Sequence, residues 1–311
     1  MPMSDGDFFH STISVGEISL HVVETRPKGV GSTHKVPGDI PLVVFLHGFP
    51  EYWRSWRHQL EAFAKAGFWA VAPDMRGYGE SDKPKGVVAY EVEHLAADIA
   101  GLIRALDRED AIVVGHDWGA IVAWYVAQLH PERVERLAIL NVPHPLQMMN
   151  GLRTLRQLAK SSYAFFFQLP AIPERAVQFY NFFFLRKMFE VDGMGADDIN
   201  HIIGALRTPH VLTSAMNYYR AIVRRVASGR LPPTRRIEAP VLVIWGDADR
   251  YLGKELATPP AQFVPNARVV HIPGASHWVQ NVACARVNEL LLAFARETCD
   301  HTAEIAANRK V

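Results

Sequence analysis

The sequence of 311 residues predicts an α/β fold with a mostly parallel central sheet flanked by helices. Short apolar runs rich in β-branched residues recur along the chain, which is typical of strands buried on both faces. Segments of helical length lie between these runs, and this alternation favours a parallel sheet covered on both sides. One long aromatic-rich segment, residues 146–232, contains no convincing strand and predicts a helical insertion.

The strands are predicted in chain order from the local pattern. Residues 8–24 alternate apolar and polar side chains around Val15-Gly16-Glu17, which favours an antiparallel hairpin. Residues 25–39 are rich in Gly, Pro, Lys and Ser and predict an exposed loop. Six apolar runs then predict buried strands at 42–46, 69–72, 111–114, 137–140, 241–245 and 268–272. With the two strands of the hairpin counted, the strand at 137–140 is the sixth, and the insertion follows it.

Three helices are predicted outside the insertion. Apolar residues from Leu95 to Leu106 fall at helical spacing, the segment after Gly119 continues apolar to Leu129, and residues 281–296 are amphipathic. The insertion would divide the chain into a first core part (1–145), a helical cap (146–232) and a second core part (233–311). Residues 299–311 predict a frayed tail.

Composition limits the classes of partner. The net charge of +1 gives no electrostatic reason for binding nucleic acid or a membrane surface. Cys284 and Cys299 make no disulfide framework and suggest a reducing compartment. The polar start is not a signal peptide, and no apolar run could span a bilayer. We expect a soluble cytoplasmic monomer or homodimer without metal or cofactor, because neither ligand spacing nor a glycine-rich phosphate loop appears.

The segment from Ala111 to Leu129 has the order strand, tight turn, helix, with Gly115-His116-Asp117-Trp118-Gly119 at the turn. This order is typical of a nucleophile elbow, in which small flanking residues lift the central side chain clear of the sheet. A carboxylate there favours attack on a saturated carbon that carries a leaving group, because attack on an ester would give an anhydride. The alternative is that Asp117 only caps the following helix.

An ester formed on Asp117 needs a base for its hydrolysis. His277 is the best placed of the histidines, in a loop between the last strand and the last helix, and it follows the nucleophile in the expected chain order. Such a base needs an acid that fixes its tautomer. Asp247 and Asp249 both follow the strand 241–245; Asp249 is preferred, since Asp247 follows the strand too closely to reach across, but the residues alone leave both open.

His47-Gly48-Phe49-Pro50 follows the strand 42–46 and predicts a tight turn that directs backbone N–H groups toward the elbow. The N–H groups of Phe49 and Trp118 would form an oxyanion hole. Trp118 is also expected to wall the substrate site, although a lone aromatic residue usually serves packing.

These motifs, with Gly246-Asp-Ala-Asp249 and Gly274-Ala-Ser-His277, resemble those of an epoxide hydrolase of the α/β-hydrolase fold. The resemblance extends over nearly the whole chain and implies Asp249 as the acid. Related haloalkane and haloacetate dehalogenases share such motifs, so these motifs imply fold and nucleophile type but not substrate.

Two matches in the cap separate these families. Tyr163-Ala-Phe-Phe-Phe-Gln168 and Asn217-Tyr218-Tyr219-Arg220 resemble the two tyrosine motifs of epoxide hydrolases. The resemblance implies Tyr163 and Tyr219 as donors to the epoxide oxygen, and a phenol suits a leaving alkoxide. Tyr218 and, more weakly, Tyr180 compete with Tyr219, and core packing is the alternative role for both donors.

The expected reaction adds water to an epoxide and gives a vicinal diol. The expected apolar pocket is formed by Phe49, Pro50, Trp118, Phe167 and Trp278. A dehalogenase on the same Asp–His–Asp residues is the alternative enzyme, and a ligand-binding protein of this fold without turnover is the alternative of another class.

Overall fold

The computed structural model describes residues 8–31 and 35–297. The predicted tail and Cys299 lie outside these residues. Among the described residues, no helix has the length and apolar character needed to cross a membrane.

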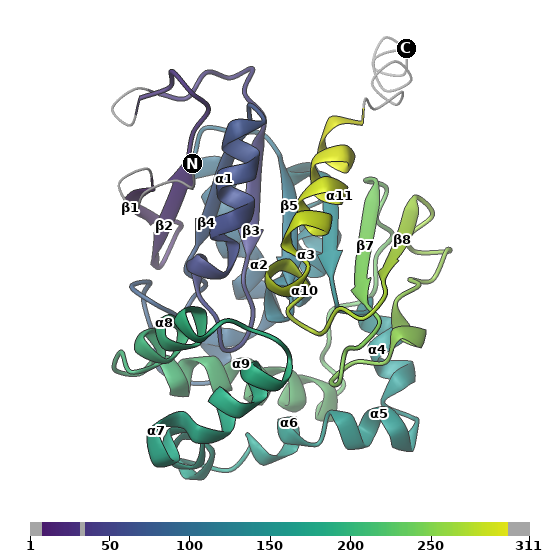
Figure 1. Ribbon diagram of the computed structural model, residues 1–311. Coiled ribbons are helices and arrows are strands. Elements are labelled where there is room, and N and C mark those ends of the chain that lie inside the picture. The colour runs from purple at the N-terminus through teal and green to yellow at the C-terminus, as the bar shows by residue number, and fades with distance from the viewer. Residues whose placement is uncertain (1–7, 32–34, 298–311) are drawn as a thin grey trace.

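An eight-stranded sheet forms the centre of the molecule, in the order β1-β2-β4-β3-β5-β6-β7-β8 (Figure 1). β1 and β2 form an antiparallel hairpin, β2 pairs antiparallel with β4, and every later neighbouring pair is parallel. The mostly parallel sheet is thus confirmed. The strands are β1 Phe9–Ser14, β2 Ser19–Thr25, β3 Leu42–Leu46, β4 Trp69–Pro73, β5 Ala111–His116, β6 Val134–Leu140, β7 Val241–Gly246 and β8 Ala267–Ile272.

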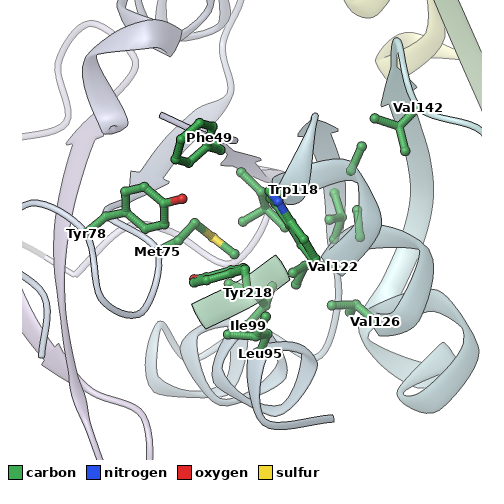
Figure 2. Close-up of a cluster of buried hydrophobic side chains, with 14 of the residues drawn as sticks. Phe49, Met75, Tyr78, Leu95, Ile99, Trp118, Val122, Val126, Val142 and Tyr218 are labelled. Atoms are coloured by element: carbon green, nitrogen blue, oxygen red, sulfur yellow. The ribbon is translucent and has the colours of Figure 1, made fainter. Parts of the chain in front are cut away.

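Helices cover both faces of the sheet. Alternate side chains of each central strand belong to two hydrophobic clusters, one on each face. Val44 of β3 packs with α2 and α3, whereas Phe45 packs with α1 and α11. Figure 2 shows part of the first cluster, with Ile99 of α2 beside Val122 of α3. These helices are α1 Arg57–Lys65, α2 Val92–Ala105, α3 Trp118–Leu129, α10 Val279–Val282 and α11 Cys284–Arg296.

Two helical segments differ from the sequence prediction. α1 was not predicted, although its buried side chains at Leu60 and Phe63 belong to the core. The helix expected at 281–296 is divided into α10 and α11, because Ala283 leaves the helical region with φ −123° and ψ 35°. Short 3-10 helices are η2 Trp53–Trp56, η3 Val88–Tyr90, η4 Pro131–Arg133 and η5 Lys254–Leu256.

Six helices lie between β6 and β7, and the described residues of this segment contain no strand. The predicted helical insertion after the sixth strand is therefore confirmed. Its helices form a layer beyond the ends of β3, β5 and β7 (Figure 1). They are α4 Pro145–Gly151, α5 Leu155–Lys160, α6 Tyr163–Phe166, α7 Ile172–Val191, α8 Ala196–Leu206 and α9 Val211–Ala227.

Candidate active site

The turn between β5 and α3 holds Asp117 in an unusual backbone conformation, with φ 48° and ψ −122°. The chain passes so close to β3 there that a Cβ on Gly119 would lie 2.0 Å from the carbonyl oxygen of Leu46. A non-glycine residue with positive φ is uncommon and costs free energy, and such strain is often found at functional sites. Local sequence therefore forms the elbow: a buried strand, then a turn that only a glycine at 119 permits.

The Asp117 carboxylate lies between a backbone donor and an imidazole. The N–H of Phe49 donates to Oδ1 at 2.7 Å, and Nε2 of His277 lies 3.5 Å from Oδ2. A Cβ on Gly48 would be 2.6 Å from Oδ1, so glycine is required for this close approach. Burial alone would raise the pKa of Asp117, but His277, His116 and the Phe49 N–H lower it, which keeps the group ionised.

His277 is hydrogen-bonded to Asp249 and not to Asp247. Its Nδ1 donates to Oδ2 of Asp249 at 2.8 Å, and both side chains are almost fully buried. Burial would lower the pKa of His277, but the carboxylates of Asp249 and Asp117 outweigh it and raise the pKa above its ordinary value. Asp247 instead pairs with the more exposed His271 at 2.7 Å.

Asn141 and the chain after Asp249 hold the carboxylate that faces His277. The side-chain amide of Asn141 donates to Oδ2 of Asp249 at 2.7 Å, and the N–H groups of Tyr251 and Leu252 donate to Oδ1 at 2.7 and 2.9 Å. The sequence prediction missed Asn141. Its signal was a polar residue directly after the buried strand 137–140, at the edge where ligands bind in such sheets.

A second buried group of polar side chains lies behind the elbow. Nδ1 of His116 lies 2.9 Å from Glu51, and its Nε2 donates to the backbone carbonyl of His277 at 3.0 Å. The amide of Gln280 lies 3.1 Å from Nδ1 of His116. His116 therefore points away from the substrate side and fixes the loop that carries His277. Glu51 and Gln280 were not predicted.

Tyr163 of α6 and Tyr219 of α9 meet above the elbow, with ring centroids 5.7 Å apart. The Tyr219 ring also contacts the rings of Trp118 at 5.0 Å and Phe49 at 5.4 Å. Burial, together with the charge of Asp117, raises the pKa of both tyrosines, so both are neutral donors near pH 7.

The two competing tyrosines are placed differently. The hydroxyl of Tyr218 donates to the carbonyl of Arg76 at 2.7 Å, so it serves the contact between the cap and the core. Tyr180 is 78% exposed on the outside of α7.

Aromatic rings line the space around the tyrosines. Phe167 lies 5.0 Å from Tyr219 and 5.5 Å from Phe49, and Pro50 is buried next to Phe49 in the chain. Trp278 instead packs between His277, at 5.1 Å, and Phe189 of α7, at 4.7 Å. Four of the predicted pocket residues, Phe49, Pro50, Trp118 and Phe167, thus lie near the two tyrosines. The fifth, Trp278, lies behind His277.

Tyr78 was not predicted, and it lies in the same hydrophobic cluster as Phe49 and Trp118 (Figure 2). Its ring contacts that of His47 at 4.9 Å, and its buried hydroxyl has no hydrogen-bond partner among the described residues. His47 has a structural role, because its Nε2 accepts from the N–H of Met75 at 2.9 Å.

The chain is similar to a known protein family and to several known proteins. The family model for the alpha/beta hydrolase fold matches residues 41–282. The AB hydrolase superfamily protein YfhM of Bacillus subtilis is 39% identical over 262 residues, which are 82% of this chain and 90% of that protein. Epoxide hydrolase 2 of Caenorhabditis elegans is 37% identical over 93% of this chain and 80% of its own length.

Solved structures of epoxide hydrolases are also similar to this chain. The epoxide hydrolase of Bacillus megaterium in complex with an inhibitor superposes with a TM-score of 0.81 at 31% identity and covers 92% of this chain and 100% of its own. Epoxide hydrolase VrEH1 of Vigna radiata has a TM-score of 0.78 at 28% identity over 95% of this chain and 100% of its own.

The family match and the similar proteins together define the class: the chain is an α/β hydrolase. The chain belongs to the α/β-hydrolase family, in the group that contains the epoxide hydrolases.

Proposed function

We propose that the protein hydrolyses epoxides to vicinal diols. The observation that carries this proposal is the meeting of two phenols, the half-buried Tyr163 and the buried Tyr219, from two different cap helices, above the carboxylate of Asp117. A leaving alkoxide needs donors that can also supply a proton, whereas a halide needs only N–H donors. The relatives named above as epoxide hydrolases support the same activity.

The first step opens the ring. Oδ2 of Asp117 is the attacking oxygen, because Oδ1 is already bonded to the Phe49 N–H. The new bond joins Oδ2 to a ring carbon, and the carbon–oxygen bond of the ring breaks. Tyr163 and Tyr219 bind the epoxide oxygen, and one phenol transfers its proton to the alkoxide. The product is a hydroxyalkyl ester of Asp117 and a tyrosinate.

The second step hydrolyses the ester. Ester formation removes the charge of Asp117, one of the groups that had raised the pKa of His277. The pKa of His277 therefore falls, and a larger fraction of the imidazole is neutral and able to accept a proton at this stage. His277 takes a proton from water, and the hydroxide attacks the carbonyl carbon of the ester. The oxyanion forms on Oδ1, where the N–H groups of Phe49 and Trp118 stabilise it. Release of the diol regenerates the Asp117 carboxylate and frees one proton. The tyrosinate takes up this proton and becomes a phenol again.

Asp249 would orient His277 and stabilise its cation during this step, in the usual manner of a buried third member of a triad. We further infer that residues 146–232 act as a cap over two core parts, 1–145 and 233–311. Phe49, Pro50, Trp118 and Phe167 would form an apolar substrate pocket, with Trp278 supporting the base from behind. Bulky or aryl epoxides fit such a lining best.

Product analysis tests the activity directly. The purified protein is given an aryl epoxide and, in parallel, a chloroalkane and fluoroacetate. Diol without halide supports the proposal. Halide without diol would mean that the tyrosines serve packing and that the enzyme is a dehalogenase.

The covalent mechanism is tested with His277→Gln. This variant should form the ester but fail to hydrolyse it, so intact-protein mass spectrometry should show an increase equal to the mass of the epoxide. Asp117→Ala is the control and should show no increase. A His277→Gln protein that still opens the epoxide but stays unmodified would exclude the covalent route.

A further inference from the structure

The outer side of the cap exposes apolar side chains that have no role in the proposed reaction. Four aromatic residues of α7, which we name the α7 aromatic surface, are exposed by 40% to 78% of their area: Phe179, Tyr180, Phe183 and Phe184. Soluble proteins rarely expose large contiguous apolar surfaces unless those surfaces bind something. This surface is therefore a candidate for docking.

The four rings form one continuous surface, because each contacts the next. The centroids lie 6.4 Å apart from Phe179 to Tyr180, 6.2 Å from Tyr180 to Phe183, and 5.5 Å from Phe183 to Phe184. α5, α6 and α7 together line the side of the molecule farthest from the strands (Figure 1). Further exposed apolar residues on and between these helices are Leu155, Leu158, Phe165, Phe166, Leu169 and Ile172.

The backbone at this surface leaves the helix. Tyr180, Asn181 and Phe182 have φ values of 45°, 56° and 59°, which side chains other than glycine seldom adopt. The resulting kink leaves Phe182 buried while Tyr180 and Phe183 are exposed. Strained backbone of this kind costs free energy and is often found at functional positions.

Charge identifies the kind of partner. Residues 146–232 contain eleven Lys and Arg against five Asp and Glu, an excess of six positive charges, although the whole chain has 33 against 32. The rest of the chain therefore carries an excess of five negative charges. Exposed basic residues occur on the same helices as the apolar ones: Arg153 and Arg156 on the α5 side, and Arg175 and Lys187 on α7.

We propose that the α7 aromatic surface docks on an anionic lipid surface. Exposed aromatic side chains enter the interface between headgroups and acyl chains, and neighbouring Arg and Lys are attracted to anionic headgroups. A second copy of the chain fits less well, because a symmetric contact would bring two positively charged caps together. The negative remainder of the molecule would orient the cap toward the lipid. The proposal does not depend on the catalytic activity.

Vesicle co-sedimentation of the full chain tests this docking. The expected result is binding to vesicles of phosphatidylglycerol and phosphatidylcholine in about equal parts, much weaker binding to phosphatidylcholine alone, and release in about 1 M salt, where charges are screened beyond about 3 Å. Phe183→Ser with Phe184→Ser should lower binding at least tenfold. Val88→Ser, an exposed apolar residue outside the cap, is the matched control and should bind normally.

Charge reversal tests the electrostatic contribution to vesicle binding. Arg175→Glu should weaken binding roughly fivefold or more, which corresponds to about one basic residue at an anionic membrane. Lys85→Glu, an exposed lysine of the core, should leave binding unchanged. Equal binding to both vesicle types, or unchanged binding of the double serine variant, would overturn the proposal. So would a dimer in analytical ultracentrifugation that the double serine variant abolishes, because a second copy would then occupy the surface.

Discussion

Adjacent residues in one helix can have opposite roles, as Tyr218 and Tyr219 of α9 illustrate. Successive helix residues point in directions about 100° apart. Tyr219 therefore faces Trp118 and Phe49, while the hydroxyl of Tyr218 is bonded to the carbonyl of Arg76. The sequence alone could not separate the two side chains by physical reasoning, because both are aromatic and both lie on a buried helix.

Phenylalanine variants test this assignment of the tyrosines. Tyr163→Phe or Tyr219→Phe should lower kcat/KM for an epoxide roughly 10- to 100-fold, and the double variant roughly 10²- to 10⁴-fold, the usual range for general acid catalysis. Steady-state kinetics provides the measurement. Tyr218→Phe should retain near-normal kinetics and lose about 1 kcal/mol of unfolding free energy. A Tyr218 variant as impaired in catalysis as Tyr219→Phe would contradict the assignment.

The pKa of His277 links the site to stability. It is raised in the folded protein to about 10, because the attraction of Asp249 and Asp117 outweighs burial. A raised pKa stabilises the folded state fully below the unfolded value of about 6.5, and this stabilisation is lost as the pH rises to about 10. The unfolding free energy of the wild type minus that of His277→Gln should therefore be larger at pH 6 than at pH 10.

Urea denaturation at the two pH values measures this difference. The exposed His201→Gln variant serves as control and should show a difference near zero at both. A wild-type advantage that is the same at pH 6 and pH 10 would mean that the imidazole is not held as a cation between the two carboxylates.

At the scale of elements, the elbow depends on the close passage of α3 past β3. A Cβ at Gly119 would lie 2.0 Å from the backbone oxygen of Leu46, and neither backbone can move without disturbing the sheet. Side chains could not relieve this contact. The glycine is thus required by packing between two elements as well as by the turn itself.

Two alanine substitutions compare a crowded glycine with an open one. Gly119→Ala should lower the free energy of unfolding by about 3 kcal/mol or more, or prevent folding, because overpacking against backbone is costly. Gly204→Ala lies within α8 with no atom within 4 Å of its new Cβ, and it should be neutral or stabilising by up to about 1 kcal/mol. Thermal and denaturant unfolding provide the measurements. A Gly119→Ala protein of normal stability would refute the packing argument.

At the scale of the whole molecule, charge is distributed unevenly between the cap and the core. The sum of +1 gave no reason to expect attraction to membranes, but the excess of six positive charges in residues 146–232 changes that expectation. Ion pairs also join the two parts. Arg57 of α1 contacts Asp198 of α8 at 2.9 Å, and Arg225 of α9 contacts Glu91 of the core at 3.0 Å.

Removing one of these ion pairs should have a small effect on the whole molecule. Asp198→Asn should lower the free energy of unfolding by about 1 kcal/mol or less, since both side chains keep about a fifth of their area exposed to solvent. Added salt should reduce the difference from the wild type. The neighbouring exposed Asp197→Asn is the control and should behave like the wild type in the same denaturation experiment.

The sequence by itself determined where the strands fall along the chain, the insertion after the sixth strand and the glycine-flanked Asp117. These features are local: buried parallel strands need continuous apolar runs, and a sharp turn needs small residues. Neither α1 nor the break at Ala283 was predicted, because tertiary packing and not local pattern decides where a short helix forms or ends.

Only the tertiary structure decided which polar groups meet. Asp249, and not Asp247, faces His277; Asn141 holds Asp249 from the end of β6; and His116 bonds to the His277 loop. These partners are separated by 28, 108 and 161 positions along the chain. Their meeting depends on strand order and on the reach of each loop, which a single sequence does not specify. Chemistry at this site is thus encoded in separate local motifs, and the parallel sheet brings their ends together.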